Sequence, residues 1–261
     1  MKNFRLTISY DGTDFTGWQI QPGYRTVQET LELAIAKVIG VRPHANASGR
    51  TDAGVHAVGQ VVNFYGETRL DPATLLRAIN ANLPDDVVVR DVEIASQAFD
   101  ATNDAVRKLY RYVINDGAVA DPFSRRYAWH SKRRLDVEAM ARAATALVGR
   151  HDFHSFETEW PNRLSSIRTI TRLSVCRAGD TIWIDVEADG FLYNMVRAIA
   201  GTLINVGRGH WPESKVAEIL KAEDRKEAGP NAPACGLFLM RVTYLNSQSF
   251  SVRANGTNES A

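Results

Sequence analysis

The chain has 261 residues, of which 44% are hydrophobic and 23% are charged. These are ordinary values for a globular protein, and they exclude a disordered or collagen-like chain. The 31 basic and 30 acidic residues leave a net charge of +1, a total that by itself argues against a nucleic-acid partner.

The first half of the chain has the pattern of mixed helices and strands. Apolar and polar residues alternate from Phe4 to Tyr10, which predicts an opening strand. Thr26 and Glu29 have the spacing of a capping box at a helix start, and Asp71 followed by Pro72 indicates a second helix start. The elements predicted for this half are a strand, a helix, a strand, a helix and a strand at residues 4–10, 27–39, 60–64, 72–79 and 87–94.

The second half repeats a similar plan. Asp136 is expected to cap a helix that ends at Gly149, and a turn at residues 178–180 joins two strands of a hairpin. A further helix is expected to stop at Gly207. The strands predicted here cover residues 109–114, 170–176, 182–187 and 237–244, and the helices cover residues 137–148, 192–206 and a short stretch after Pro212.

Antiparallel-type strands mixed with helices in both halves predict an α+β architecture. We expect an N-terminal subdomain at residues 1–104 and a C-terminal subdomain at 105–245. A polar tail at 246–261 is predicted to be disordered.

The charges are distributed unevenly along the chain. Residues 103–134 hold eight basic residues against three aspartates, and residues 163–177 hold four arginines and no acidic residue. Acidic runs at 85–104 and 180–189 restore the balance. A charge run alone is most often a solvated face. Because tyrosine and tryptophan residues lie in or beside the basic runs, a polyanion-binding surface fits them better.

Several common sites and locations are excluded by composition and spacing. The chain has no P-loop, no glycine fingerprint for a dinucleotide, no G-x-S-x-G and no C-x-x-C. His151 and His154 lack a suitably spaced third ligand, so we expect no metal there and interpret them as packing a helix exit. Two cysteines fit a reducing cytoplasm. The longest stretch without Lys, Arg, Asp or Glu, residues 53–66, is shorter than the ~20 residues of a membrane span, and the start MKNFRLTISY lacks a signal-peptide core.

The most informative segment is SGRTDAGVHA, which begins at Ser48 just before a predicted strand. Gly49 and Gly54 bracket Asp52, so the backbone can turn tightly and expose this carboxylate. An aspartate with a pKa near ~3.9 is anionic at neutral pH, and we expect Arg50 to reinforce that charge. From spacing alone, an Asx-type turn closed by Asp52 is favoured over a catalytic role.

The complete string resembles the signature of the TruA family of tRNA pseudouridine synthases, in which the aspartate of GRTDAGVHA is catalytic. Further similar motifs follow in the same order, from Tyr10 to about Tyr244: YDGTDFTGWQIQP, TVQE, RKLYRY, GRHDF, FLYNMVR, GTL and PACGLFL. The resemblance implies two related RRM-like or ferredoxin-like halves that form a continuous, mainly antiparallel sheet with helices on one face. It also implies a basic catalytic cleft and a homodimer.

The resemblance further implies the reaction and the site. Members isomerise uridine to pseudouridine at positions 38, 39 and 40 of the tRNA anticodon stem-loop, without a cofactor. Asp52 would be the catalytic carboxylate, by attack on the base, attack on the sugar or proton abstraction from the sugar. The expected substrate-binding residues, with core packing or solvent exposure as the plain alternatives, are Tyr110, Arg197, Arg50, Leu237 and Leu239. Tyr110 would stack on the target base and Arg197 would pair with Asp52, whereas Tyr112 is expected to pack in the core.

Basic and neighbouring residues are expected to contact the RNA. These residues are Phe99, Thr102, Asn103, Arg107, Lys108, Arg125, Arg126, Arg133, Trp160 and Arg163. Thr102 stands where the family commonly has arginine, so a phosphate contact at this place is expected to pass to Arg107 or Lys108.

Two other classes of function compete with this interpretation. A non-catalytic RNA-binding protein with an RRM-like sheet would carry an RNP1-type aromatic strand, and no such string occurs. It would also leave the loop from Arg50 to Asp52 unexplained. A metal-dependent nuclease would need more acidic residues near Asp52 than the sequence provides.

Overall fold

The computed structural model describes residues 1–158 and 165–245. Trp160 and Arg163, two of the expected RNA contacts, and the predicted tail at 246–261 lie outside the described residues. The strands are β1 (Lys2–Tyr10), β2 (Asn46–Ala47), β3 (His56–Gly66), β4 (Val87–Ala95), β5 (Ala105–Asn115), β6 (Trp129–His130), β7 (Gly149–Asp152), β8 (Ile167–Ala178), β9 (Thr181–Ala188) and β10 (Leu237–Tyr244). The helices are α1 (Val27–Ile39), α2 (Pro72–Asn80), α3 (Val137–Ala144), α4 (Met195–Gly207) and α5 (Lys215–Ala222).

All of these strands belong to one sheet. Its order is β4-β1-β3-β10-β5-β9-β8-β7, with β2 also paired to β3 and β6 to β5. The strand pairs are antiparallel except for β10 with β3 and β5 with β6. The predicted α+β class and the mainly antiparallel sheet are therefore confirmed.

The N-terminal strands are built from alternating side chains. In β1, Phe4, Leu6 and Ile8 are fully buried, whereas Arg5 and Thr7 between them are partly exposed. Such alternation turns every second side chain toward the same face of a sheet. Phe4 lies opposite Phe64 of β3, and their rings stack with centroids 5.2 Å apart.

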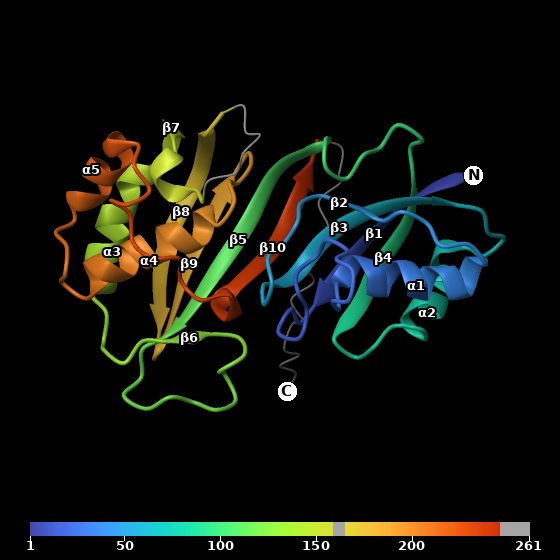
Figure 1. Cartoon of the computed structure of the whole chain (residues 1–261), viewed down its shortest axis with the longest axis horizontal. Coiled ribbons are helices and arrows are strands. Elements are labelled where there is room, and N and C mark those ends of the chain that lie inside the picture. The colour runs from blue at the N-terminus through green and yellow to red at the C-terminus, as the bar shows by residue number, and fades with distance from the viewer. Residues whose placement is uncertain (159–164, 246–261) are drawn as a thin grey trace, which may run out of the picture.

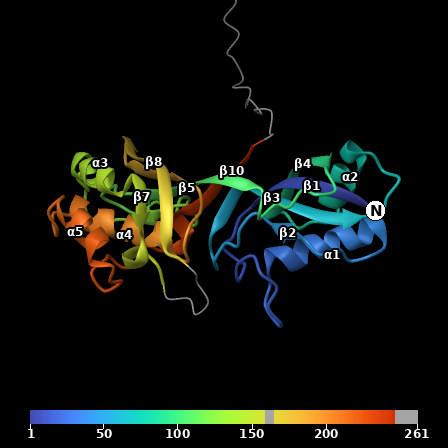
Figure 2. The same ribbon diagram turned by 90° about the horizontal axis from the view of Figure 1, so that it is seen from above.

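The strand β10 joins the two halves of the sheet. Phe238 and Leu239 pair in parallel with His56 and Ala57 of β3, while the opposite edge of β10 runs antiparallel to β5. Figure 1 shows β10 in red between β3 and β5, with α1 and α2 toward one end of the molecule and α3, α4 and α5 toward the other. Figure 2 shows the same two groups of helices after a 90° turn. The expected boundary after residue 104 falls at the start of β5.

Two of the predicted helix caps are present, and one is wrong. Asp71 and Asp136 accept hydrogen bonds of 2.9 Å from the backbone N–H groups three residues later. Thr26 is the N-cap of α1, but its side chain makes no capping hydrogen bond. The first N–H groups of α1 instead donate to the carbonyl oxygens of Gly17 and Trp18, at 3.2 and 3.1 Å. Tertiary contacts with this loop therefore replace the capping box.

Two helix ends also differ from the predicted ones. The helix after Asp136 was expected to reach residue 148, but α3 ends at Ala144 and a 3-10 turn covers Thr145–Leu147. Gly149, with a φ of 113°, opens β7 instead of ending a helix, because residues 149–152 pair with β8. The helix predicted to start at residue 192 starts at Met195 instead. Asn194 has a φ of 62°, which lies outside the right-handed helical region, so the helix can begin only after it.

Within residues 1–158 and 165–245, none of the helices combines the length and the apolar character needed to cross a bilayer.

Candidate active site

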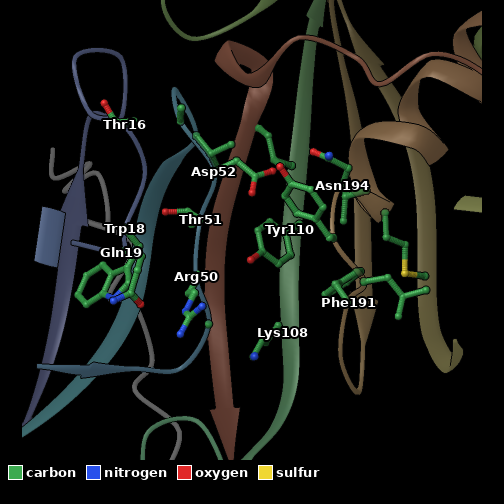
Figure 3. Close-up of a pocket in the computed structure, with 18 of the residues that line it drawn as sticks. Thr16, Trp18, Gln19, Arg50, Thr51, Asp52, Lys108, Tyr110, Phe191 and Asn194 are labelled. Carbon is green, nitrogen blue, oxygen red and sulfur yellow. The ribbon is translucent and has the colours of Figure 1, made fainter. Parts of the chain in front are cut away.

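A pocket of about 650 Å³ lies between the two halves of the sheet. One wall comes from the loops after β1 and before β3, and the other comes from β5, from the segment that begins α4 and from the start of β10. Figure 3 shows the side chains that line it. The lining residues are Thr16, Trp18, Gln19, Gln21, Gly49, Arg50, Thr51, Asp52, Ala53, Val55, Lys108, Tyr110, Phe191, Leu192, Tyr193, Asn194, Met195, Val196 and Leu237.

The loop that carries Asp52 closes through its backbone. The N–H of Val55 donates to the carbonyl oxygen of Asp52 at 3.1 Å, and Gly54 has a φ of 75°, a conformation that favours glycine. The Asp52 side chain does not close this turn, in contrast to the Asx-type alternative, and it faces the pocket. Gly49, the other bracketing glycine, has no positive φ.

Buried polar groups hold the same loop from beneath. The hydroxyls of Tyr10 and Thr51 lie 2.8 Å apart, and the amide of Gln60 donates to the Gly49 carbonyl oxygen at 2.7 Å. The Ser48 hydroxyl donates to the side-chain oxygen Oε1 of Gln60 at 2.5 Å. Burial raises the pKa of Tyr10 to about 12 against smaller opposing effects of its hydrogen bonds, so this phenol stays protonated. Strands β1 and β3 thus fix the backbone that presents Asp52.

Asp52 forms an ion pair with Arg197 across the pocket. Its Oδ2 lies 3.6 Å from Nη1 of Arg197, and only about a quarter of each side chain is exposed. Arg197 is oriented by two further acceptors: Nε donates to the Ala232 carbonyl oxygen at 2.7 Å and Nη1 donates to Oδ1 of Asn194 at 2.9 Å. The pairing that the resemblance implied is therefore present.

The expected influence of Arg50 on Asp52 is wrong. Burial raises the pKa of Asp52, and the partial opposing effect comes from Arg197. Arg50 is exposed and points away from Asp52 in Figure 3. The reason is local geometry: Thr51 is buried against Tyr10, so the turn sends the side chains on either side of it in different directions.

Tyr110 and Tyr112 have different surroundings although both lie on β5. Tyr110 lines the pocket, and its ring meets the ring of Phe191 edge-on, with centroids 5.0 Å apart. Burial, followed by repulsion from the Tyr10 phenolate when that group ionises and from the Asp52 carboxylate, raises the pKa of Tyr110, so its hydroxyl is protonated at neutral pH. Tyr112 is fully buried and donates to the Pro233 carbonyl oxygen at 2.8 Å, which confirms the expected core packing.

The two leucines expected at the apolar wall separate in the structure. Leu237 lines the pocket and lies opposite Tyr112 in the strand pairing. Leu239 lies opposite Tyr110, is fully buried and is not among the lining residues. Leu237 is therefore the one of these two leucines that faces the pocket.

The basic residues of the segments on either side of β6 are at the surface. Arg125, Arg126 and Arg133 are all exposed. Arg126 lies 3.8 Å from a carboxylate oxygen of Asp11 and 3.6 Å from one of Asp14, so its charge is partly offset within the protein.

The three expected RNA contacts that precede β5 differ in their exposure and in their partners within the protein. Phe99 packs edge-on against Tyr244, with ring centroids 5.2 Å apart, and is partly buried. The Thr102 hydroxyl donates to the Ala47 carbonyl oxygen at 2.7 Å and thus fastens this turn to β2. Asn103 is exposed.

Arg107 and Lys108, the expected replacements for an arginine at position 102, differ in their surroundings. Arg107 lies 3.6 Å from a carboxylate oxygen of Glu187 and is more than half exposed. Lys108 lines the pocket itself.

The two histidines expected at a helix exit lie in β7 (His151) and in the 3-10 turn after it (His154), because α3 already ends at Ala144, and both have local partners. Nε2 of His151 lies 3.0 Å from the Val148 carbonyl oxygen, and Nδ1 of His154 lies 3.1 Å from a carboxylate oxygen of Glu157.

Sequence reasoning did not single out several pocket residues. Trp18 and Gln19 reach the pocket from the loop after β1, and Phe191, Tyr193 and Asn194 reach it from the segment before α4. Both segments lie inside motifs of the resemblance, GWQ and FLYN, which was the available signal. Which side chains of a loop face a pocket depends on its backbone path, and periodicity does not give that path.

Most of this chain is similar to known proteins of one family. A family model described as tRNA pseudouridine synthase matches residues 6–102 and 143–245. The chain belongs to the tRNA pseudouridine synthase family. As a member it is an isomerase, and the family that the sequence resembles is confirmed.

Curated relatives align over nearly their whole length. Proteins named tRNA pseudouridine synthase A from Brevibacillus brevis and Bacillus subtilis are 46% and 43% identical over 244 residues. The first alignment covers 94% of this chain and 100% of the relative, and the second covers 93% and 99%. Among solved structures, a Cbf5-Nop10-Gar1 complex aligns with 90% of this chain and 57% of its own, at a TM-score of 0.34 and 12% identity.

Proposed function

We propose that this pseudouridine synthase isomerises uridines 38, 39 and 40 in the anticodon stem-loop of tRNA, with Asp52 as the catalytic carboxylate. The observation that carries the proposal is the Asp52–Arg197 ion pair in a pocket that also holds Tyr110. The positions in tRNA come from the family resemblance.

The reaction defines what the pocket must supply. The N1–C1′ bond breaks, the uracil turns, C5 joins C1′, and the C5 proton leaves to a base. No atom is added and no redox change occurs. Such an isomerisation needs a carboxylate near the sugar or C6, a proton acceptor and walls that retain the detached base.

Each pocket residue fits one of these needs. Asp52 supplies the carboxylate, and Arg197 holds its orientation through the 3.6 Å contact. Tyr110 presents a buried ring with a protonated hydroxyl, suited to stacking on the uracil, and Leu237 offers an apolar contact. Fixed groups of this kind lower the barrier because little reorganisation is needed during the reaction.

The target uridine must leave a stacked stem before it enters such a pocket. Flipping a base out of a duplex requires a few kcal/mol. Phosphate contacts from the exposed arginines of the β5–β6 loop would supply part of this free energy and make binding dependent on salt.

The proposed function is tested by release of tritium from tRNA labelled at uridine C5. Wild-type enzyme should release tritium without an added cofactor, and Asp52→Asn should reduce the rate by more than about 1000-fold while tRNA affinity changes little. Asp85→Asn, at an exposed position, is the matched control and should keep the wild-type rate. A substituted enzyme with near-normal turnover would remove Asp52 from its catalytic role, and a wild type that binds tRNA without releasing tritium would indicate a binding protein.

The resemblance and the cysteine content extend the proposal to a cytoplasmic homodimer with subdomains at residues 1–104 and 105–245. Light scattering of the purified chain should give twice the mass of one copy.

A further inference from the structure

Lys108 lies at the opposite end of the pocket wall from Asp52. It is two residues from Tyr110 on β5, so both side chains project from the same face, about 7 Å apart along the strand. Figure 3 shows Asp52, Tyr110 and Lys108 following one another along the wall formed by β10 and β5. The three residues therefore line one side of the pocket in succession.

The ammonium of Lys108 is only partly satisfied by the protein. It donates to the carbonyl oxygen of Ser48 at 2.5 Å, and among the described residues this is its single hydrogen-bond partner. An ammonium has three donors, so two remain for another group. An added Cβ at Gly49 would lie only 3.1 Å from Nζ, which places the ammonium close against the Asp52 loop.

The charge of Lys108 is not balanced by a carboxylate. Among the described residues, no acidic side chain forms an ion pair with it, whereas Arg107, Arg111, Arg126, Arg134 and Arg177 each have such a partner. Burial, followed by the charge of Arg168, lowers the pKa of Lys108. Arg50 adds a further positive charge to the lining of the same pocket. A half-buried cation with cationic neighbours is unfavourable until an anion joins it.

We propose that Lys108 binds a phosphate group that flanks the target uridine. This inference rests on the proposed function and names the part of the substrate that one pocket residue holds. Asp52 repels a phosphodiester at its end of the pocket, while Lys108 offers a positive charge and two donors at the other end. The uridine is thereby oriented, with its sugar toward Asp52 and one flanking phosphate toward Lys108. A lysine is a flexible point charge, so it can follow backbones that enter from neighbouring positions.

The test is a chemical double-mutant cycle that uses the intact enzyme and full-length tRNA. Two substrates each carry one neutral methylphosphonate, on the 5′ or the 3′ side of a single target uridine. Wild type should lose about tenfold to hundredfold in kcat/KM on one of these substrates. Lys108→Met should show a similar loss on unmodified tRNA and no further loss on that same substrate, because the contact is already absent.

A purely structural role of Lys108, through Ser48, predicts a different pattern. Loss of the loop contact would reduce turnover equally on modified and unmodified tRNA, so the two losses would multiply on both substrates. That outcome overturns the phosphate contact. Lys108→Arg, which keeps the charge, should again lose kcat/KM when the flanking phosphate is replaced by the methylphosphonate. If the methylphosphonate does not change kcat/KM of this variant, the inference is also contradicted.

Two controls separate this inference from other failures. Lys132→Met removes an exposed lysine of the basic run. Any loss of kcat/KM from this substitution should multiply with the loss from the methylphosphonate on both substrates. If wild type forms no pseudouridine in unmodified tRNA, the proposed function itself fails. If wild type is active and Lys108→Met gives multiplying losses, only the phosphate contact is excluded.

Discussion

Asp52 is held where its charged form is disfavoured. Burial raises its pKa, and Arg197 only partly counteracts this effect. A carboxyl whose folded pKa lies above its unfolded value binds its proton more tightly in the folded state. Stability therefore falls as pH rises from the unfolded value of ~3.9 through the raised folded value, and it stays lower at neutral pH. The catalytic carboxylate thus lowers the stability of the fold that presents it.

Asp52→Asn should consequently raise the melting temperature at pH 7, because the amide carries no charge to desolvate. The difference from wild type should disappear below pH ~3.9, where the carboxyl is protonated in both states. Circular dichroism at the two pH values measures it. Asp85→Asn, at an exposed position, should leave the melting temperature unchanged. A lower melting temperature of Asp52→Asn at pH 7 would contradict the linkage.

Arg197→Met should move the acid limb of kcat/KM toward higher pH. The guanidinium lowers the pKa of Asp52, so its removal allows burial to raise that pKa further. Misorientation of the carboxylate should also reduce kcat by about 100-fold at the optimum. A pH profile of tritium release shows both effects, and Arg125→Met serves as the control without a shift. An unchanged acid limb in Arg197→Met would mean that the ion pair does not set the protonation of Asp52.

Single residues also show the limits of sequence reasoning about the site. Asp52 could be identified from its motif, and the resemblance supplied Arg197. Arg50 was assigned to Asp52 because it is near in the sequence, but a tight turn sends neighbouring side chains apart. The partner lies 145 positions away in α4, and no local pattern could indicate it.

At the scale of elements, α4 positions the site through close backbone packing. An added Cβ at Gly201 would lie 1.8 Å from the Pro230 carbonyl oxygen. The same segment is tied to α4 by the Ala232 N–H, which donates to the Arg197 carbonyl oxygen at 3.0 Å, and by the Gly229 N–H, which donates to the Thr202 hydroxyl at 2.9 Å. The position of the Arg197 side chain therefore depends on a glycine one turn further along the helix.

Gly201→Ala should destabilise the protein by about 1–3 kcal/mol, although alanine normally favours a helix by up to about 1 kcal/mol. The backbone carbonyl of Pro230 cannot move aside as a side chain can. Gly207→Ala, in the same helix, would meet the Met140 sulfur and should cost less because that side chain can rearrange. Urea denaturation of the two variants gives the comparison. Equal losses would show that close backbone contact is not the cause.

The elements themselves were largely predictable because most of them are periodic. Alternation found β1, and the aspartate caps found the starts of α2 and α3. The capping box at Thr26 failed because the Gly17 and Trp18 carbonyl oxygens satisfy the helix start. Short strands such as β2 and β6 were not predicted, since two residues hold no period and only their partner strands define them.

At the scale of the whole molecule, the near-zero net charge hides a local excess of positive charge. The exposed residues Arg125, Arg126 and Arg133 lie in the two segments that flank β6, and Arg126 alone among them has carboxylate neighbours in the described structure. Net charge therefore says little about an RNA partner, because phosphates respond to the nearby charges within about 10 Å at moderate salt.

Arg125→Met and Arg133→Met should each weaken tRNA binding and reduce the slope of log K against log salt by up to about 0.9. Arg126→Met should reduce the slope less, because Asp11 and Asp14 already offset part of its charge. Filter binding over a range of salt concentrations gives the three slopes. If all three variants keep the wild-type slope, the segments that flank β6 do not contact the RNA backbone.

The strand β10 lies between β3 and β5 in the sheet, although it is the last strand in sequence among the described residues. A ribosome therefore completes both groups of helices before it delivers the strand that connects them. Leu237, which forms part of the pocket wall, emerges with that strand. A nascent chain stopped before this point would hold Asp52 and Arg197 in halves that share no central strand. A stop codon before β10 therefore removes a residue of the pocket wall together with the strand that pairs with both β3 and β5.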